Sequence, residues 1–320
     1  MSHFTVLVIG DDVGKQLAPF HEFECTGTDD EYVQEIDETT DVLARTKPVE
    51  EGGEGETLEE ALEYFDFSDE RGNIVHSMSA INRAGPHQYR YAHVTDDGKL
   101  IHAVKRTNPN AHWDWWKIGG RWAGCFKLKL GHMGKLGEHS LGIPRPASDR
   151  ADQCFKKGVD MEAMRTENRA RAASQYDAWE QATAGLPQAK TWAAICEEVK
   201  ALAEVDPSAI GIESWHVVAR VQYQSQARVK ACSRDEALRW CRDAIAEFSP
   251  TREQYIQAAE DETAVPHAIV HEGKWLESGE MGWWGVVHNE KDPAEWNRVF
   301  RALWESLPDD TMVTLVDCHI

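Results

Sequence analysis

The chain of 320 residues lacks any long apolar run. A membrane-spanning helix needs about 20 consecutive apolar residues, and no such stretch is present, so we expect no membrane partner. Residues 1–9 also lack the basic start and the small-residue cleavage site of a secretory signal. These two absences predict a cytoplasmic protein.

Cysteine is sparse, and the recognised catalytic motifs are missing. The seven cysteines are scattered without a Cys-x-x-Cys pair, which predicts reduced thiols and argues against a cysteine-based zinc site. Cys125 can be interpreted as an activated thiol or as a small core residue. Nucleophile elbows, His-Glu-x-x-His helices, Walker loops and EF-hand loops are all absent. The sequence therefore assigns no cofactor and leaves open whether the protein is an enzyme.

Positive charge is in short supply, with 34 Lys and Arg against 55 Asp and Glu, a net charge of −21. This balance argues against duplex DNA as a partner, because phosphate neutralisation dominates DNA binding. Residues 22–70 carry nineteen Asp and Glu against Arg45 and Lys47, a net −17. Residues 99–157 carry twelve Lys and Arg against four Asp and Glu, a net +8. Both runs are compatible with solvated faces, but the basic run could also attract a phosphate group.

The hydrophobic pattern predicts an α+β fold with antiparallel or mixed sheets and packed helices. Residues 3–9 are expected to form a buried strand, and residues 88–94 and 99–105 a hairpin around Asp96-Asp97-Gly98. Three helix starts are marked by capping patterns. They are Thr57-x-x-Glu60, Thr251-x-x-Gln254 and Asp292-Pro293-x-Glu295.

We expect three regions along the chain. Residues 1–158 are predicted to be a β-rich domain with an acidic loop, and residues 159–210 a helical connector. Residues 211–320 are predicted to be a C-terminal α+β domain resembling the ferredoxin-like βαββαβ unit with one inserted helix. Its strands are expected at 214–224, 266–271, 282–288 and 311–317. The N- and C-terminal strands could share one sheet.

Residues 113–124, Trp-Asp-Trp-Trp-Lys-Ile-Gly-Gly-Arg-Trp-Ala-Gly, predict a ligand site. A Gly-Gly pair loses backbone entropy unless a turn or close approach requires it, and tryptophan faces are suited to stacking on a base. In this hypothesis the glycines and the arginine hold an anion, Trp113 or Trp116 stacks on its ring, and lysines add positive potential. The predicted ligand-binding residues are Trp113, Trp116, Lys117, Gly119, Gly120, Arg121 and Lys127. In the competing interpretation Trp115 and Trp122 are core residues and the glycines only shape a turn.

The last residues offer a second candidate. Asp317 and His319 share a face of the predicted terminal strand, which suits two metal ligands or a carboxylate–histidine acid–base pair. His21 or Glu24 could add a third ligand if the first and last strands are neighbours. The spacing matches no known metal motif, so an exposed strand end is favoured and no metal is assigned.

The chain resembles a family of uncharacterised proteins from phages and prophages. The matching stretches are Met1–Gly10, Lys15–Phe20, Asn108–Asn110 with Trp113–Gly124, Lys274–Val287 and Leu307–Ile320. The resemblance implies a viral or mobile-element origin and brings no activity with it. The resulting hypothesis is a phage accessory protein that binds a small anionic, nucleotide-like ligand. The alternative is a non-catalytic protein that binds a host protein, as an anti-defence inhibitor or a nucleic-acid mimic.

Overall fold

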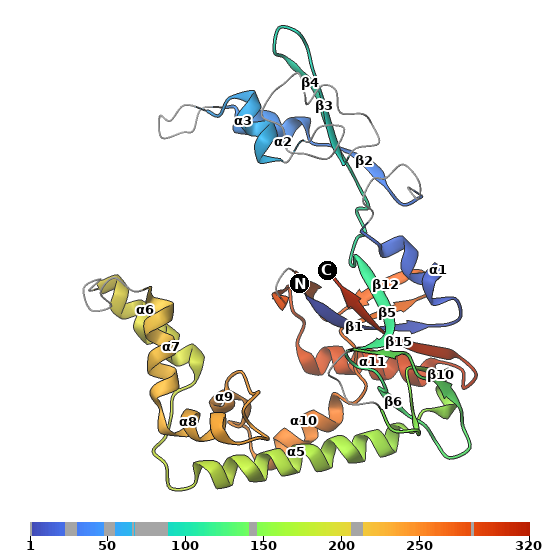
Figure 1. The fold of residues 1–320 in the computed structure, drawn as a ribbon, viewed down its shortest axis with the longest axis vertical. Helices are drawn as coiled ribbons and strands as arrows, with labels where there is room; N and C mark the ends of the chain where they lie inside the picture. The colour runs from blue at the N-terminus through green and yellow to red at the C-terminus, as the bar shows by residue number, and fades with distance from the viewer. Residues whose placement is uncertain are drawn as a thin grey trace.

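The computed structural model describes residues 2–22, 31–47, 55–65, 67, 89–140, 146–205, 214–282 and 285–320. The fold is α+β, as predicted. Figure 1 shows a body built on a sheet that contains both termini, a small lobe above it, and a helical arm that extends to one side.

The sheet of the body is organised around the two terminal strands. Strand β1 (His3–Ile9) pairs antiparallel with β15 (Met312–His319) along its whole length. On its other edge β1 pairs in parallel with β11 (Ala268–His271), which continues antiparallel to β12 (Lys274–Glu277). The first and last strands therefore lie side by side, and both are central in the sheet.

The edge of β15 that faces away from β1 pairs with two strands from the middle of the chain. Its N-terminal half pairs with β10 (Gln153–Phe155), and its C-terminal half pairs with β5 (Trp115–Gly120). The boundary that we expected at residue 158 is therefore crossed by the sheet, because β15 follows it and is hydrogen-bonded to β10 and β5, which precede it. The short strands around this edge are β6 (Phe126–Lys127), β7 (Gly134–Lys135), β8 (Glu138–His139) and β9 (Arg150–Ala151).

Each face of the sheet is covered by helices. Side chains alternate along a strand, so Leu7 and Leu315 face one side, where they pack with α11 (Pro293–Ser306) and α5 (Met161–Thr183). Val6 and Val316 face the other side, towards α1 (Val13–Leu17). Burial of each such aliphatic side chain contributes about 1.5–3 kcal/mol. The terminal strands are thus fixed from both faces.

The predicted start of α11 is confirmed. Asp292 caps the helix by accepting the backbone N–H of Glu295, and Pro293 occupies its first turn. Trp296 is buried, and its indole N–H donates to the carbonyl of Pro266 at 2.8 Å. The helix is therefore fixed against the end of the loop that leads into β11.

The small lobe is an insertion between η1 (Ala18–Phe20) and β5. Its described residues form the sheet β2–β4–β3, the helices α2 and α3, and an apolar core of their own. The predicted hairpin and the capping box of Thr57 and Glu60 are both confirmed. The elements of the lobe are β2 (Gln34–Asp37), α2 (Thr39–Arg45), α3 (Leu58–Tyr64), β3 (Arg90–Val94) and β4 (Leu100–Thr107).

The two chain segments that lead into and out of the lobe are joined by Asn108. Its side chain is buried, and its amide donates to the carbonyls of Pro19 at 2.8 Å and His21 at 2.9 Å. The backbone N–H of Glu22 donates to the carbonyl of Trp113. The base of the lobe is therefore hydrogen-bonded to the body at the start of β5.

The strand that we expected at 214–224 is wrong. This segment forms α7, because Trp215, Ala219 and Tyr223 also recur at helical spacing and pack against Ile195 and Val199 of α6. Residues 211–320 therefore do not form a ferredoxin-like unit of their own, and two of their strands, β11 and β15, pair with β1 instead. The remaining helices and short strands are α6 (Trp192–Val205), α7 (Trp215–Ser225), α8 (Ala227–Arg234), α9 (Ala244–Glu247), α10 (Arg252–Asp261), η2 (Lys156–Gly158), β13 (Glu280–Met281) and β14 (Val287–His288).

Candidate functional site on the terminal strands

The two adjacent glycines at the end of β5 allow the backbone to approach two buried carboxylates. Gly119 and Gly120 have φ angles of 81° and 59°, which side chains rarely adopt. A Cβ atom on Gly119 would lie 2.7 Å from Oδ2 of Asp152, and one on Gly120 would collide with the carboxylate of Asp317. The Gly-Gly pair is therefore required by the fold.

Asp152 organises the loop that follows. Its side chain is fully buried and accepts the backbone N–H groups of Gly124 at 2.6 Å, Cys125 at 3.0 Å and Gly137 at 2.9 Å. Burial raises the pKa of this carboxyl, and the three hydrogen bonds oppose the rise. An acidic side chain thus occupies the position in which the sequence suggested an anionic ligand, and the expectation that Gly119 and Gly120 hold an external anion is corrected.

Asp317 links the second glycine to the N-terminal strand. It is fully buried; Oδ2 accepts the backbone N–H of Arg121 at 2.9 Å, and Oδ1 lies 2.8 Å from Nδ1 of His3. Because an ionised carboxylate only accepts hydrogen bonds, Nδ1 of His3 carries a proton. The opposite ring nitrogen, Nε2, is then the atom of His3 that is left for other partners.

A second histidine is fixed in the same way. Nδ1 of His319 lies 2.7 Å and 2.9 Å from the two carboxylate oxygens of Asp114. Asp114 also accepts the backbone N–H of Trp115 at 2.6 Å, so the carboxylate itself is held in place. Unlike Asp317, Asp114 is partly exposed, with a side-chain exposure of 41%.

The two histidines lie next to each other because His3 and His319 are direct partners in the register of β1 and β15. Their ring centroids are 5.0 Å apart at an interplanar angle of 75°. Trp115 stacks on His319 and meets His3 edge-on, at centroid distances of 5.5 Å. We call His3, His319, Asp114, Asp317 and Trp115 the histidine-pair site.

The outer nitrogens of the pair are available. Within the described residues neither His3 nor His319 has a hydrogen-bond partner at Nε2, and neither of these atoms is fully buried. His267 contrasts with them, because its Nε2 is both buried and unpaired. The two side chains are only 12% and 6% exposed, so the rings are held firmly while one edge of each reaches solvent.

Two positive side chains come from the segment that carries Trp115. Arg121 is exposed, and among the described residues its guanidinium forms no ion pair or hydrogen bond. Lys117 comes from the same strand, with Nζ 5.4 Å from the centroid of the Trp115 ring. Both residues were predicted as ligand-binding residues, and both remain candidates.

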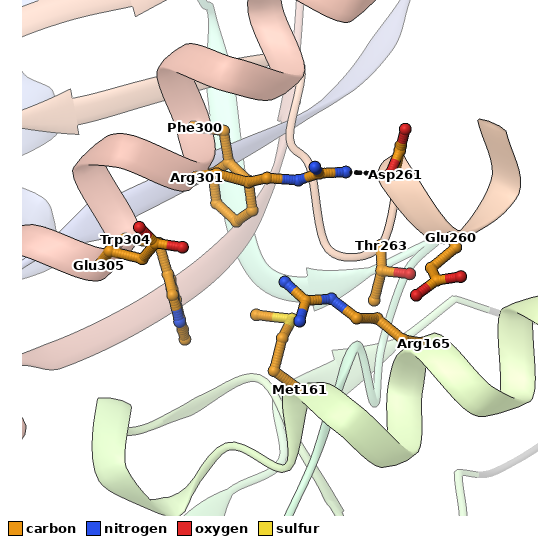
Figure 2. Close-up of a pocket in the computed structure, with 9 residues that line it drawn as sticks. All are labelled: Met161, Arg165, Glu260, Asp261, Thr263, Phe300, Arg301, Trp304 and Glu305. Atoms are coloured by element: carbon orange, nitrogen blue, oxygen red, sulfur yellow. Dashed lines mark hydrogen bonds and ion pairs between the residues drawn. The ribbon is translucent and has the colours of Figure 1, made fainter. Parts of the chain in front are cut away.

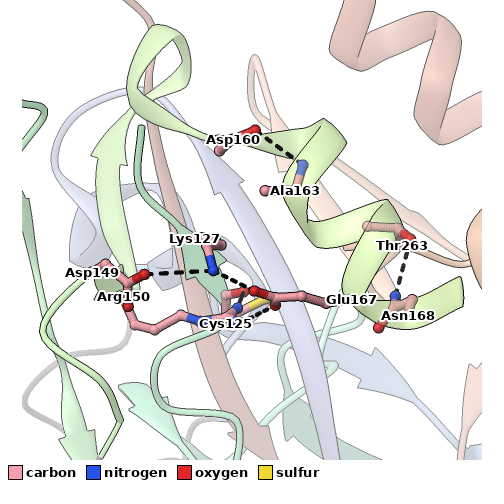
Figure 3. Close-up of polar contacts among 9 residues, drawn as sticks. All are labelled: Cys125, Lys127, Asp149, Arg150, Asp160, Ala163, Glu167, Asn168 and Thr263. Atoms are coloured by element: carbon pink, nitrogen blue, oxygen red, sulfur yellow. Dashed lines mark hydrogen bonds and ion pairs between the residues drawn. The ribbon is translucent and has the colours of Figure 1, made fainter. Parts of the chain in front are cut away.

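Lys127 is a correction to the predicted set. Figure 3 shows its amino group directed at Glu167 and Asp149, with Arg150 also directed at Glu167. The hydrogen bond to Glu167 raises the pKa of Lys127. This charge is therefore already paired with carboxylates of the protein, in a partly exposed cluster.

The tryptophans of the segment are distributed differently from the prediction. Trp113 is only 6% exposed, and its indole N–H donates to the carbonyl of Leu17 at 3.2 Å. Trp116 packs against the core on the α1 side of the sheet. Trp115 and Trp122 are instead the exposed pair, at 39% and 38%. The choice of Trp113 as a stacking ring is therefore wrong, because Trp113 precedes β5 and strand alternation does not extend to it. Trp116 is partly buried against the core and is less exposed than Trp115 or Trp122.

The metal candidates do not converge. Asp317 and His319 do share a face, as expected, but each is bonded to a different partner. Nε2 of His21 lies 2.8 Å from the carbonyl oxygen of Asp114, and Glu24 lies outside the described residues. Across the described ranges no group of three or more His, Cys, Asp or Glu side chains is arranged to hold a metal ion.

Cys125 is a core residue. Burial raises the pKa of its thiol to about 12, and Asp152 adds to the rise. A thiol of this kind is protonated at neutral pH and is a weak nucleophile. The interpretation of Cys125 as an activated thiol is therefore wrong.

A separate pocket of about 200 Å³ lies between α5, the end of α10 and α11 (Figure 2). Arg301 is paired there with Asp261, and Arg165 lies 4.0 Å from Glu162. Neither histidine of the pair lines this pocket. Both arginines that line it lie close to a carboxylate. We therefore regard the histidine-pair site as the stronger candidate.

Comparison with family models, with curated proteins and with solved structures gives no match for this chain. Among the helices that the structure describes, none is both long and apolar enough to cross a membrane.

Proposed function

We propose that the histidine-pair site, together with Arg121, binds a small anionic ligand of the nucleotide type. The observation that supports this most is the pair of Nδ1-anchored imidazoles with available Nε2 atoms. The carboxylate that anchors His3 also binds the backbone of Arg121, whose exposed guanidinium has no partner among the described residues. Imidazole and guanidinium N–H groups are strong donors to phosphate oxygens. Most other charge on this chain is negative, so anions are attracted only where such donors gather.

The position of Arg121 relative to the histidines is fixed by one carboxylate. Its backbone N–H and the ring of His3 bond to the two oxygens of Asp317, so the residue cannot move away from the pair without losing a buried hydrogen bond. In this proposal its exposed side chain extends to an anion bound at the two Nε2 atoms. This preorganisation limits the entropy that is lost on binding.

Trp122 supplies the aromatic surface of the proposal. It follows Arg121 directly, is 38% exposed, and its indole forms no ring contact with another described residue. Trp115, in contrast, is covered by His319 on one face. We therefore assign base stacking to Trp122, a contribution of about 1–3 kcal/mol in comparable sites.

The experiment is a binding titration with uridine and adenosine monophosphates, the matching nucleosides and inorganic phosphate, followed by tryptophan fluorescence and thermal shift. We expect the nucleoside monophosphates to bind more tightly than the nucleosides or inorganic phosphate alone. Arg121→Ala and Trp122→Phe weaken binding, whereas Arg239→Ala and Trp240→Phe do not. Arg239 and Trp240 are the matched control, since this exposed pair lies between α8 and α9, on the helical arm. Equal effects from both pairs, or no binding, would reject the proposal.

The acidic region favours a rival function. Part of it folds as a lobe with its own core, joined to the body around Asn108 (Figure 1). The run Glu50–Glu54 lies outside the described residues, so it contributes only charge to this argument. The rival is a protein that binds a basic surface of a host protein, consistent with the phage resemblance. Capture of such a partner that survives Arg121→Ala but not neutralisation of residues 50–63 would favour the rival.

A further inference from the structure

We propose that the histidine-pair site cleaves a ribonucleotide strand, with His3 and His319 as general acid and general base. This inference rests on the proposed function, since it concerns the same site, and it names both the substrate class and the reaction. The substrate is a single strand of RNA, in which each phosphodiester has a neighbouring 2′-hydroxyl.

The geometry supplies two proton-transfer groups at one place. The ring centroids are 5.0 Å apart, and both rings are anchored at Nδ1 by separate carboxylates. The proposal places both Nε2 atoms at the oxygens of a single phosphate group. Separate anchors also let one ring be neutral while the other is protonated, which is the state that paired acid–base catalysis needs.

The nucleophile has to come from the substrate or from water. Thr5 is on the same strand face, but its Oγ1 accepts the backbone N–H of His267 at 3.0 Å. Cys318, the neighbour of both Asp317 and His319, faces the opposite core, and burial raises the pKa of its thiol. A ribose 2′-hydroxyl is already positioned beside its own phosphorus atom, which gives it the advantage of an intramolecular attack.

The reaction balances with these groups alone. The neutral histidine takes the proton of the 2′-hydroxyl at Nε2 while O2′ forms a bond to phosphorus. The bond between phosphorus and O5′ breaks, and O5′ receives a proton from Nε2 of the protonated histidine. The products are a 2′,3′-cyclic phosphate and a free 5′-hydroxyl, and the two histidines have exchanged protonation states. The guanidinium of Arg121 offsets the additional negative charge of the transition state.

The carboxylates have a positioning role. Asp114 holds the imidazole of His319 in one orientation and fixes its Nδ1 as the donor to the carboxylate, without touching substrate. Asp114 is partly exposed, so a change there does not leave a buried cavity. Asp114→Asn should therefore lower kcat and displace the pH optimum while KM changes little, a pattern that a loss of folding would not produce.

The test uses the full chain and three labelled oligonucleotides: all DNA, all RNA, and DNA with one ribonucleotide. We expect cleavage only after a ribonucleotide, a product end with the mass of a 2′,3′-cyclic phosphate, and no loss of rate in EDTA. His3→Gln and His319→Gln should each lower the cleavage rate at a saturating concentration of the strand at least 100-fold, in line with typical acid–base contributions. His216→Gln is the matched control, because His216 is exposed and stacked on Trp215 in the helical arm.

Each outcome is informative. RNA that binds in an Arg121-dependent way but stays intact would overturn this inference and leave the proposed function standing. Cleavage that survives both histidine substitutions, or that also occurs in the all-DNA strand, would overturn it as well. If neither nucleotides nor RNA bind, the proposed function itself fails.

Discussion

His3 and His319 lie opposite each other across the two terminal strands, with their ring centroids 5.0 Å apart, although 316 positions separate them in the chain. Each ring is anchored by a carboxylate from a different place: Asp317 in the same strand as His319, and Asp114 just before β5. The site therefore exists only when both chain ends and the middle of the chain have folded together. A correctly formed site therefore indicates that these three parts of the body have folded.

Gly120→Ala should destabilise the protein strongly. The added Cβ would collide with the carboxylate of Asp317, and the φ angle of 59° is itself unfavourable for alanine. We expect a loss of about 2–4 kcal/mol from backbone strain of about 1–3 kcal/mol together with displacement of the buried carboxylate. Urea unfolding followed by tryptophan fluorescence measures the change.

Gly131→Ala is the control for that prediction. Its φ angle is also positive, at 80°, but an added Cβ would meet nothing within 4 Å. The difference between the two variants isolates the collision with Asp317. Equal losses would show that the carboxylate does not require the glycine.

Lys127→Ala should leave nucleotide binding unchanged, in contrast to Arg121→Ala. The charge of Lys127 is already paired with Glu167 and Asp149, whereas the guanidinium of Arg121 is unpaired within the described residues. Partly exposed ion pairs contribute little, so we expect Lys127→Ala to cost at most about 1 kcal/mol of stability. Isothermal titration with a nucleoside monophosphate compares the two variants. Weaker binding by Lys127→Ala would place the anion elsewhere in the basic segment.

Protein stability should fall between neutral pH and mildly acidic pH because of His267. Burial lowers the pKa of this histidine below its ordinary value of 6.5, so its protonation costs free energy only in the folded state. The unfolded chain then binds more protons, and stability is lost as the pH falls below about 6.5. Urea unfolding at pH values from 5 to 7.5 should show a shallower decline for His267→Gln than for the wild type.

Two features sharpen that comparison. Burial also lowers the pKa of His112, so part of the decline should remain in His267→Gln. His216→Gln, which changes an exposed histidine, should keep the full decline. Identical slopes for the wild type and His267→Gln would contradict the prediction.

Asn108→Ala should loosen the small lobe without unfolding the body. The amide of Asn108 donates to the carbonyls of Pro19 and His21, and its loss leaves these partly buried acceptors without that donor, at about 1–3 kcal/mol. Hydrogen exchange should rise at residues 18–22 and 108–113 and stay unchanged in β11. Uniform protection in both regions would show that Asn108 does not hold the lobe.

Local features of this fold were predictable from the sequence. The strand at 3–9, the hairpin of β3 and β4, and the helix after Asp292 are set by alternation, by turn residues and by capping, all of which act over a few positions. The segment 214–224 misled because its apolar residues fit both the period of a strand and that of a helix, and only packing against α6 decides between them.

The site was only partly predictable. Asp317 and His319 were expected to share a face, but their partners His3 and Asp114 depend on strand pairing between distant segments. The role of Gly119 and Gly120 could not be predicted either. The carboxylates that they approach, those of Asp152 and Asp317, lie 33 and 197 positions further along the chain. An antiparallel pairing of the first and last strands, with the two chain ends aligned, places His3 beside His319. This neighbourhood could therefore have been predicted from the sequence.

The most direct test of the account is a nitrogen-15 NMR spectrum of the histidine rings, recorded while a nucleoside monophosphate is added. We predict that His3 and His319, assigned with His3→Gln and His319→Gln, show a proton on Nδ1 in the free protein. Addition of ligand should shift their Nε2 signals and leave those of His216 and His267 unchanged. Unaltered signals from the pair at saturating ligand, or a proton on Nε2 with Nδ1 bare, would contradict the account.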